Sequence, residues 1–139
     1  MASSIVIGSD GCISLPAYAT LAAYQYHGVK LYAGGYVTIG DADGDLLVGV
    51  LQNIPAAKEE PAHVFVQSGG ICMAYAGEAL ATIGTLLTTD QYGHFIAAVD
   101  ADVVCGKVFT TAGASGDLFM MIFETPHHAA NVSVSTTGS

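Results

Sequence analysis

Short apolar segments alternate along the chain with polar breaks that are rich in glycine and aspartate. The apolar segments consist mostly of Val, Ile, Leu, Phe and Tyr, which is typical of strands rather than of helices. This pattern predicts a mainly β chain. The expected strands are Tyr24–Tyr32, Tyr36–Ile39, Leu46–Gln52, His63–Gln67, Ile71–Ala76, Thr85–Thr88, His94–Ala98, Val103–Phe109 and Asp117–Phe123.

Two segments allow a second interpretation. Pro16–His27 is dominated by Ala and Leu, and its proline suits the first turn of a helix, so a short helix is an alternative to the start of the first strand. Gly77–Gly84 fits either a turn of helix or a kinked strand. The predicted fold is therefore a small β-sandwich or a β-barrel (tulip-like) domain, with at most one or two short helices and extended termini.

An internal repeat accompanies this pattern. An ungapped offset of 57 residues lays Val37–Val66 over His94–Phe123, with acidic turns, glycines and apolar positions in register. Each copy contains an acidic turn, an apolar strand with a glycine, a small-residue turn and a closing apolar strand. We interpret the copies, near 37–66 and 94–123, as two related hairpin units. The alternative is chance matching in a chain rich in Ala, Val, Gly and Asp.

The ends differ in composition from the middle. We expect an N-terminal arm at residues 1–15, a single β domain at 16–125 and a polar C-terminal tail at 126–139. The start of the chain lacks the basic residues and compact apolar block of a signal peptide. Such ends either stay disordered or become ordered on a neighbouring subunit.

Charge is scarce and strongly acidic. The chain has 139 residues, of which 11% are charged and 52% hydrophobic, with three lysines, no arginine and a formal net charge of −9. A chain with so few cations is expected to bind no nucleic acid, because phosphates would repel it. It also lacks the arginines that usually bind phosphate and carboxylate groups. With no apolar run long enough for a membrane span, we expect no membrane partner.

The candidate chemistry is sparse. Asp41–Asp45 resembles the start of a calcium loop, but Leu46 and Gln52 stand where the loop needs Gly and Glu. The odd number of cysteines favours free thiols and synthesis in a reducing cytoplasm, and we place Cys72 and Cys105 in the core. The five histidines show no zinc spacing. We therefore expect no catalytic residue, no metal and no cofactor.

Interface residues are the better candidates. The run Leu118–Phe123 is apolar at every position, so it is either a strand buried on both faces or a strand at a subunit interface. Tyrosines on one parity of an expected strand suggest a second contact. The apolar residues of the N-terminal arm suggest a third. The candidate interface residues are Ile5, Val6, Ile7, Tyr24, Tyr26, Tyr32, Met120 and Phe123.

A series of short phrases runs along residues 24–123, at Gly49–Asn53 with Pro55, Gly77 with Gly84 and Leu86–Leu87, Asp90 with Gly93, and Ala112 with Gly116–Asp117. The order of these phrases resembles the capsid cement, or head decoration, proteins of tailed bacteriophages. The chain departs from the family pattern in its more charged turn Lys58–Glu60 and in Asn131–Ser139, which extend beyond the final strand. The "A-x-x-G-D" turn of the pattern is matched with one extra residue.

The resemblance implies a structural protein rather than an enzyme. Members of this family bind the outside of an expanded icosahedral head, usually as homotrimers, and hold neighbouring copies of the major capsid protein together. The implied location is the outer surface of the virion capsid, after synthesis in the host cytoplasm, and the terminal arms are candidates for reaching the lattice.

Two alternatives remain at this stage. One is another β-rich assembly subunit, such as a tail-tube, fibre or surface-layer protein. The other is a trimeric nucleotide hydrolase of the dUTPase type, which would need arginine and a phosphate-contacting motif that this chain lacks.

Overall fold

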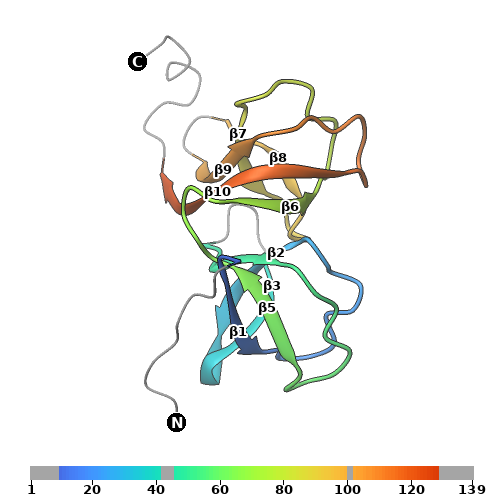
Figure 1. Ribbon diagram of the computed structural model, residues 1–139, viewed down its shortest axis with the longest axis vertical. Coiled ribbons are helices and arrows are strands. Elements are labelled where there is room, and N and C mark those ends of the chain that lie inside the picture. Colours follow the sequence, from blue (N-terminus) through green and yellow to red (C-terminus); the bar gives the residue numbers. More distant parts are fainter. Residues whose placement is uncertain (1–9, 42–45, 100–101, 129–139) are drawn as a thin grey trace.

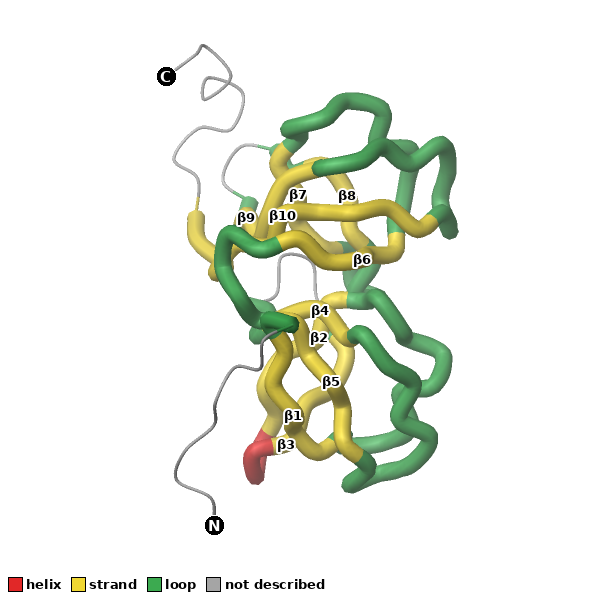
Figure 2. Tube along the Cα trace, in the orientation of Figure 1, coloured by secondary structure: helices red, strands yellow, loops and turns green. Residues whose placement is uncertain are grey.

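A computed structural model describes residues 10–41, 46–99 and 102–128 of the chain. The described residues form ten short strands and one three-residue 3-10 turn, which confirms the predicted mainly β fold (Figure 1, Figure 2). The elements are β1 (Cys12–Pro16), β2 (Gly28–Tyr32), η1 (Ala33–Gly35), β3 (Tyr36–Ile39), β4 (Gly49–Leu51), β5 (Pro61–Phe65), β6 (Ile71–Tyr75), β7 (Leu86–Thr89), β8 (Phe95–Ala97), β9 (Val103–Val108) and β10 (Leu118–His128).

The strands form two antiparallel five-stranded sheets, one from each half of the chain. The first sheet has the order β1-β5-β4-β2-β3, and the second has the order β6-β10-β9-β7-β8. Counted from its own first strand, the second sheet repeats the strand order of the first. The chain is therefore a tandem duplication of one five-stranded unit. We call β1–β5 the first half and β6–β10 the second half.

The strand registers of the two halves also correspond. In the first half Ser14 pairs with His63 across β1 and β5, and in the second half Met73 pairs with Met120 across β6 and β10. The pairings between the other strands superpose in the same way. We call residues at matching register positions counterparts, so that Met73 is the counterpart of Ser14 and Met120 the counterpart of His63.

Each sheet curls until its last strand approaches the chain that follows its first strand. A parallel bridge between Ala17 and Val37 closes the first half, and a parallel bridge between Ala76 and Phe95 closes the second. These two bridges join counterpart residues. Each half is thus a small, partly closed barrel that leaves few strand edges open.

Each half has a buried apolar cluster of its own. Eight buried residues form the cluster of the first half, and each of them has a buried counterpart in the second. Leu21 corresponds to Leu80, for example, and Val64 corresponds to Met121. The duplication therefore extends from the backbone to the residues that exclude water from each core.

The halves share part of their core. Val50 and Phe65 lie next to Leu51 and Val64 along their strands, and the alternation of a strand turns them away from the first half's own cluster. They are buried in the cluster of the second half instead. The first half is thereby stacked on the second, as Figure 1 shows.

Both predicted end segments are too long. Cys12–Leu15 pair with β5 as part of β1, although we assigned them to an N-terminal arm at residues 1–15. At the other end β10 continues to His128, so the strand includes the first residues of the predicted tail at 126–139. The remainder of both end segments lies outside the described residues.

Neither of the two ambiguous segments forms a helix. Within Pro16–His27 the chain makes turns after β1, one of them closed by the Tyr24 N–H, which donates to the Leu21 carbonyl at 3.0 Å. The expected strand at Tyr24–Tyr32 consequently begins only at Gly28. The segment Gly77–Gly84 also runs through turns between β6 and β7.

Candidate interaction surfaces

The strand β10 lies between β6 and β9, and its side chains alternate between the core and the outside. Phe119, Met121 and Phe123 are buried, whereas Leu118 and Met120 are exposed. The prediction of an interface at Phe123 is therefore wrong, because this side chain is only 1% exposed and belongs to the core. Met120, at 37% exposed, lies on the open side of the sheet.

The open side of the second sheet carries a continuous apolar surface. The cross-strand pairs Ile71–Ile122 and Met73–Met120 lie on it, and the Phe109 N–H donates to the Met120 carbonyl at 2.9 Å from the end of β9. All of these side chains are exposed or half-buried, and none is charged. Lys107 borders them on β9, where it pairs with Ile122 and lies 3.5 Å from the Glu124 carboxylate. We call this surface the β6–β10 face. It consists of Ile71, Met73, Phe109, Leu118, Met120 and Ile122.

The corresponding surface of the first half is different. Ser14, Pro61 and His63 are the exposed counterparts of Met73, Leu118 and Met120. The same fold thus presents a serine and a histidine to solvent in one half and methionines in the other. Folding alone does not require an apolar surface at these positions, because the first half folds without one. An uncovered apolar surface of this kind is typical of a site that binds another protein.

A cluster of tyrosines forms the end of the first half that points away from the second. The rings of Tyr18 and Tyr32 have centroids 4.4 Å apart, and Tyr36 lies 5.8 Å from Tyr18. The Lys58 ammonium lies 5.0 Å and 5.2 Å from the ring centroids of Tyr18 and Tyr36. We call Tyr18, Tyr32 and Tyr36 the tyrosine end. Tyr32, a predicted interface residue, is 44% exposed here.

A carboxylate contacts the tyrosine end. The Tyr36 hydroxyl donates to the Glu59 carboxylate at 2.6 Å, and this hydrogen bond is the main reason why the pKa of Tyr36 is raised. The bond favours the protonated phenol, which donates it, and the Lys58 ammonium lies over the same ring. The tyrosine end therefore presents aromatic surface together with both signs of charge.

Tyr24 and Tyr26 lie elsewhere, in the chain before β2. Both are half-buried and precede β2, so they do not share a strand with Tyr32 as predicted. The Tyr26 carbonyl accepts a hydrogen bond from the Tyr75 N–H at 2.9 Å, and the Tyr24 ring lies 5.4 Å from the ring of His27. Tyr26 therefore belongs to the contact between the halves, whereas Tyr24 packs against the first half's own cluster.

The sequence analysis missed the histidines that meet at this junction. The ring of His27 stacks on Tyr75 with a centroid distance of 4.5 Å and lies 4.9 Å from the ring of His94. Asp90 contacts His94 at 3.1 Å. His27 and His94 are far apart in the sequence, so only their positions before β2 and before β8, in a duplicated fold, could have suggested that they meet.

The histidines at this junction are packed against aromatic rings and the backbone. Burial lowers the pKa of His27, whose Nδ1 is also 3.1 Å from the Gln25 carbonyl oxygen. A neutral His27 is thereby favoured next to the second imidazole. Within the described ranges, no three His, Cys, Asp or Glu side chains are grouped so that they could hold a metal ion.

The cysteines are poor nucleophiles in their surroundings. Cys72 and Cys105 are buried in the core of the second half, as predicted. Burial raises the pKa of Cys72 to about 12 and also raises the pKa of Cys105. The pKa of the half-buried Cys12 is raised as well, mainly by burial and also by Asp10. Because the thiolate is the reactive form, these shifts disfavour covalent chemistry.

A groove lies between the two halves beside β2. It has a volume of about 510 Å³, and its walls are mostly apolar. The Lys30 ammonium at its rim forms an ion pair with Asp41, 2.5 Å away. The lining residues are Lys30, Leu31, Leu46, Leu47, Val48, Val66, Phe123, Thr125 and Pro126.

Some predicted positions lie outside the described residues, namely Ile5, Val6 and Ile7 and most of the acidic turn at Asp41–Asp45. None of the helical structure within residues 10–41, 46–99 and 102–128 is long and apolar enough to cross a membrane. Compared with known proteins, the chain matches no protein-family model and no curated protein.

Proposed function

We propose that this chain is a structural protein of a tailed-phage virion, a cement protein without a catalytic role. In this proposal it binds the outer surface of an icosahedral head as homotrimers and stabilises the lattice of the major capsid protein. The phrase order of residues 24–123 suggests this class of protein. The observation that carries the proposal is the uncharged β6–β10 face, which is left open on a well-packed fold.

The chemistry of the surface supports the same proposal. A protein that holds subunits together needs interface area with an apolar centre rather than activated side chains. Six uncharged apolar side chains on neighbouring strands supply such a centre, and the tyrosine end supplies a second surface with aromatic rings. The acidic remainder keeps the free protein soluble until these surfaces are covered.

The direct test is binding to heads. We expect the protein to co-sediment saturably with purified expanded heads that lack a decoration protein, and to raise the temperature at which those heads release DNA. Empty heads before expansion serve as the control, because the lattice that the cement protein recognises forms on expansion. A strict monomer in light scattering, together with no binding to expanded heads, would contradict the proposal.

A pair of deletions tests the role of the N-terminal arm. Deleting residues 1–9 removes Ile5–Ile7 and leaves β1 intact, so we expect weaker head binding with an unchanged unfolding temperature. Deleting residues 1–14 also removes most of β1, which pairs with β5, so we expect a marked loss of stability. Unchanged head binding by the shorter deletion would show that the arm does not hold the lattice.

A further inference from the structure

The junction between the halves shows which two surfaces of this repeating unit fit together. On the first half, the outer side of β4 and β5 and the chain before β2 are covered. The Gly28 N–H donates to the Gly93 carbonyl at 2.8 Å, and the Gln52 side chain donates to the Met73 carbonyl at 3.1 Å. Phe65 is buried in the second half's cluster. The second half contributes its β7–β8 turn and β6 to this contact.

The covered surface of the first half, on the outer side of β4 and β5, corresponds to the outer side of β9 and β10 in the second half. On the second half this surface is open to solvent. Cys12, Gln52 and Phe65 lie at the junction, and their counterparts Ile71, Phe109 and Ile122 belong to the β6–β10 face. Ile71 and Phe109 are each 42% exposed. Ile83 is also exposed, and it precedes Gly84, whose N–H donates to the Val108 carbonyl at 2.8 Å.

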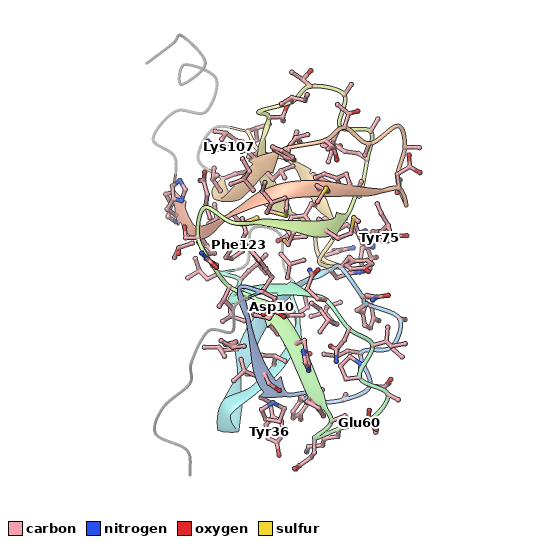
Figure 3. The ribbon with its side chains drawn as sticks, in the orientation of Figure 1. Asp10, Tyr36, Glu60, Tyr75, Lys107 and Phe123 are labelled. Atoms are coloured by element: carbon pink, nitrogen blue, oxygen red, sulfur yellow. The ribbon has the colours of Figure 1, made fainter. Side chains whose placement is uncertain are left out.

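The second half covers the first partly with its β7–β8 turn. The corresponding turn of the first half, between β2 and β3, is not covered. Gly93 and His94 of the second half contact the first half, and their counterparts are Gly35 and Tyr36 in the β2–β3 turn. A Cβ atom at Gly93 would lie 2.8 Å from the Gly28 carbonyl oxygen, whereas a Cβ atom at Gly35 would meet nothing within 4 Å. Figure 3 shows Tyr75 where the halves meet and Tyr36 at the far end of the first half.

We propose that the tyrosine end of one copy of this chain packs on the β6–β10 face of a second copy. This contact repeats between molecules the contact that already joins the two halves within a molecule. The two surfaces that such a contact needs are both present, both aromatic or apolar, and in different halves of the chain.

Charge also favours a second copy as the partner. Each molecule carries a net charge of −9, so copies repel one another wherever acidic residues face each other. The six members of the β6–β10 face are uncharged, and Lys107 beside Ile122 is balanced by Glu124 at 3.5 Å. The tyrosine end carries the Lys58 ammonium close to Glu59. These are therefore surfaces on which copies can meet without adding to the repulsion.

The contact joins two different surfaces, so it continues from copy to copy until it closes. Such a head-to-tail contact produces a ring when the rotation closes and a filament when it does not. The choice of a closed ring of three copies rests on the proposed function. The head-to-tail contact itself rests only on the duplication.

Two lysine substitutions test the two surfaces separately. Ile71→Lys places a charge in the β6–β10 face, and Tyr32→Lys places one in the tyrosine end. Both positions are exposed, so the fold tolerates the change, and each new lysine reduces the net negative charge of the chain. Loss of association therefore reflects burial of a charge rather than added repulsion. Exposed Ile54→Lys, outside both surfaces, is the matched control.

In sedimentation velocity at increasing protein concentration, we expect the unchanged protein and Ile54→Lys to associate. Ile71→Lys and Tyr32→Lys should each associate about a hundredfold more weakly, the cost of a charge in the centre of an interface. Circular dichroism and the unfolding temperature confirm that each variant is folded. An unchanged protein that stays monomeric at its highest soluble concentration overturns the inference, and so does normal association by either surface variant.

Mixing the two surface variants distinguishes a head-to-tail contact from a symmetric one. Ile71→Lys retains an intact tyrosine end, and Tyr32→Lys retains an intact β6–β10 face. We therefore expect a mixture to form one-to-one dimers at concentrations where each variant alone is monomeric. A mixture that remains monomeric would show that an intact tyrosine end and an intact β6–β10 face do not suffice for association, and would overturn the tyrosine end as the occupant of the face.

Head binding separates this inference from the proposed function. Copies that associate through the two surfaces but do not bind expanded heads would contradict the cement function and leave the contact standing. Copies that bind heads normally in spite of both substitutions, and that stay monomeric in solution, would overturn the contact and leave the cement function standing.

Discussion

Two residues of the first half have a backbone conformation that normally favours glycine. Tyr26 and Glu59 have φ angles of 70° and 77°. Their counterparts in the second half are Gly84 and Gly116, with φ angles of 89° and 93°. The duplicated fold demands the left-handed conformation at both places, and only the second half meets it with the residue that has no Cβ. In the first half the Glu59 carboxylate accepts the Tyr36 hydroxyl hydrogen bond, which offsets part of the cost.

The demand for this conformation is testable in the second half. Gly116→Ala should lower the free energy of unfolding by about 1–2 kcal/mol, because an added Cβ is strained at positive φ. The nearest atom to that Cβ would be the Tyr75 hydroxyl oxygen at 3.5 Å, so steric contact contributes little. Gly113→Ala in the same turn is the control, since Gly113 does not have a positive φ. Urea unfolding of both variants measures the difference, and equal stability of the two would contradict this account.

The lowered pKa of His27 predicts how the stability of the protein changes with pH. Burial lowers its pKa below the ordinary 6.5, so the unfolded chain binds a proton more readily than the folded protein. Above that pH both states are neutral at this residue, and it contributes no pH dependence. As the pH falls through 6.5, only the unfolded state takes up the proton, and the free energy of unfolding decreases until the pH reaches the lowered value.

The variant His27→Phe isolates this effect. It keeps an aromatic ring against Tyr75 and removes the titrating group. We expect the protein to lose more stability than the variant between about pH 7.5 and about pH 5.5, measured by urea unfolding. The histidines outside this junction are present in both proteins, so the comparison cancels their contributions. The same loss in both proteins would mean that His27 protonates equally in the folded and unfolded states.

At the scale of elements, β10 shows why a wholly apolar run does not predict which side of its strand faces the core. Every residue of Leu118–Phe123 is apolar, so the sequence alone could not say which set of alternate positions faces the core. The structure buries Phe119, Met121 and Phe123 and leaves Leu118 and Met120 outside. The neighbouring strands decide this orientation, because β10 crosses the sheet between β6 and β9.

Truncation of two residues from this run checks the assignment. Phe123→Ala should cost about 3–5 kcal/mol in the free energy of unfolding, because it leaves a cavity in the second half's core. Met120→Ala, on the outer side of the same strand, should cost less than about 1 kcal/mol in the isolated chain. Chemical unfolding measured below the concentration at which copies associate gives both values. A reversed order would place Phe123 at the surface, as the sequence analysis expected.

The repeat could be recognised only in part from the sequence, because the offset between matching residues changes along the chain. An offset of 57 residues superposes β4 and β5 on β9 and β10, where the loops of the two halves have equal lengths. The counterparts in β3 and in β1 are displaced from that offset by insertions in the turns, so an ungapped comparison loses them. The expected strand at Tyr24–Tyr32 failed because its alternation continues through Tyr26, whose positive φ interrupts a strand.

At the scale of the whole molecule, the candidate surfaces depended on knowing how the halves are stacked. Met120 and Tyr32 could be named from their residue types, and both are exposed. Tyr24 and Tyr26 are tyrosines too, but both are half-buried within the chain, Tyr24 against the first half's cluster and Tyr26 where one half packs on the other. Sequence does not distinguish an interface within the chain from one between chains, because both bury aromatic residues against a partner.

The last prediction follows from the acidic net charge of the whole molecule and concerns how salt affects association. Copies that meet through the β6–β10 face and the tyrosine end gain little from ion pairs across the contact, while each carries a net charge of −9. Raising the ionic strength from about 0.05 M to about 0.5 M shortens the range of their repulsion and leaves apolar burial in place. Association measured by sedimentation should therefore strengthen as salt is added. Uncharged sucrose at matched viscosity is the control, and association that weakens with salt would mean that ion pairs, rather than apolar surfaces, hold the copies together.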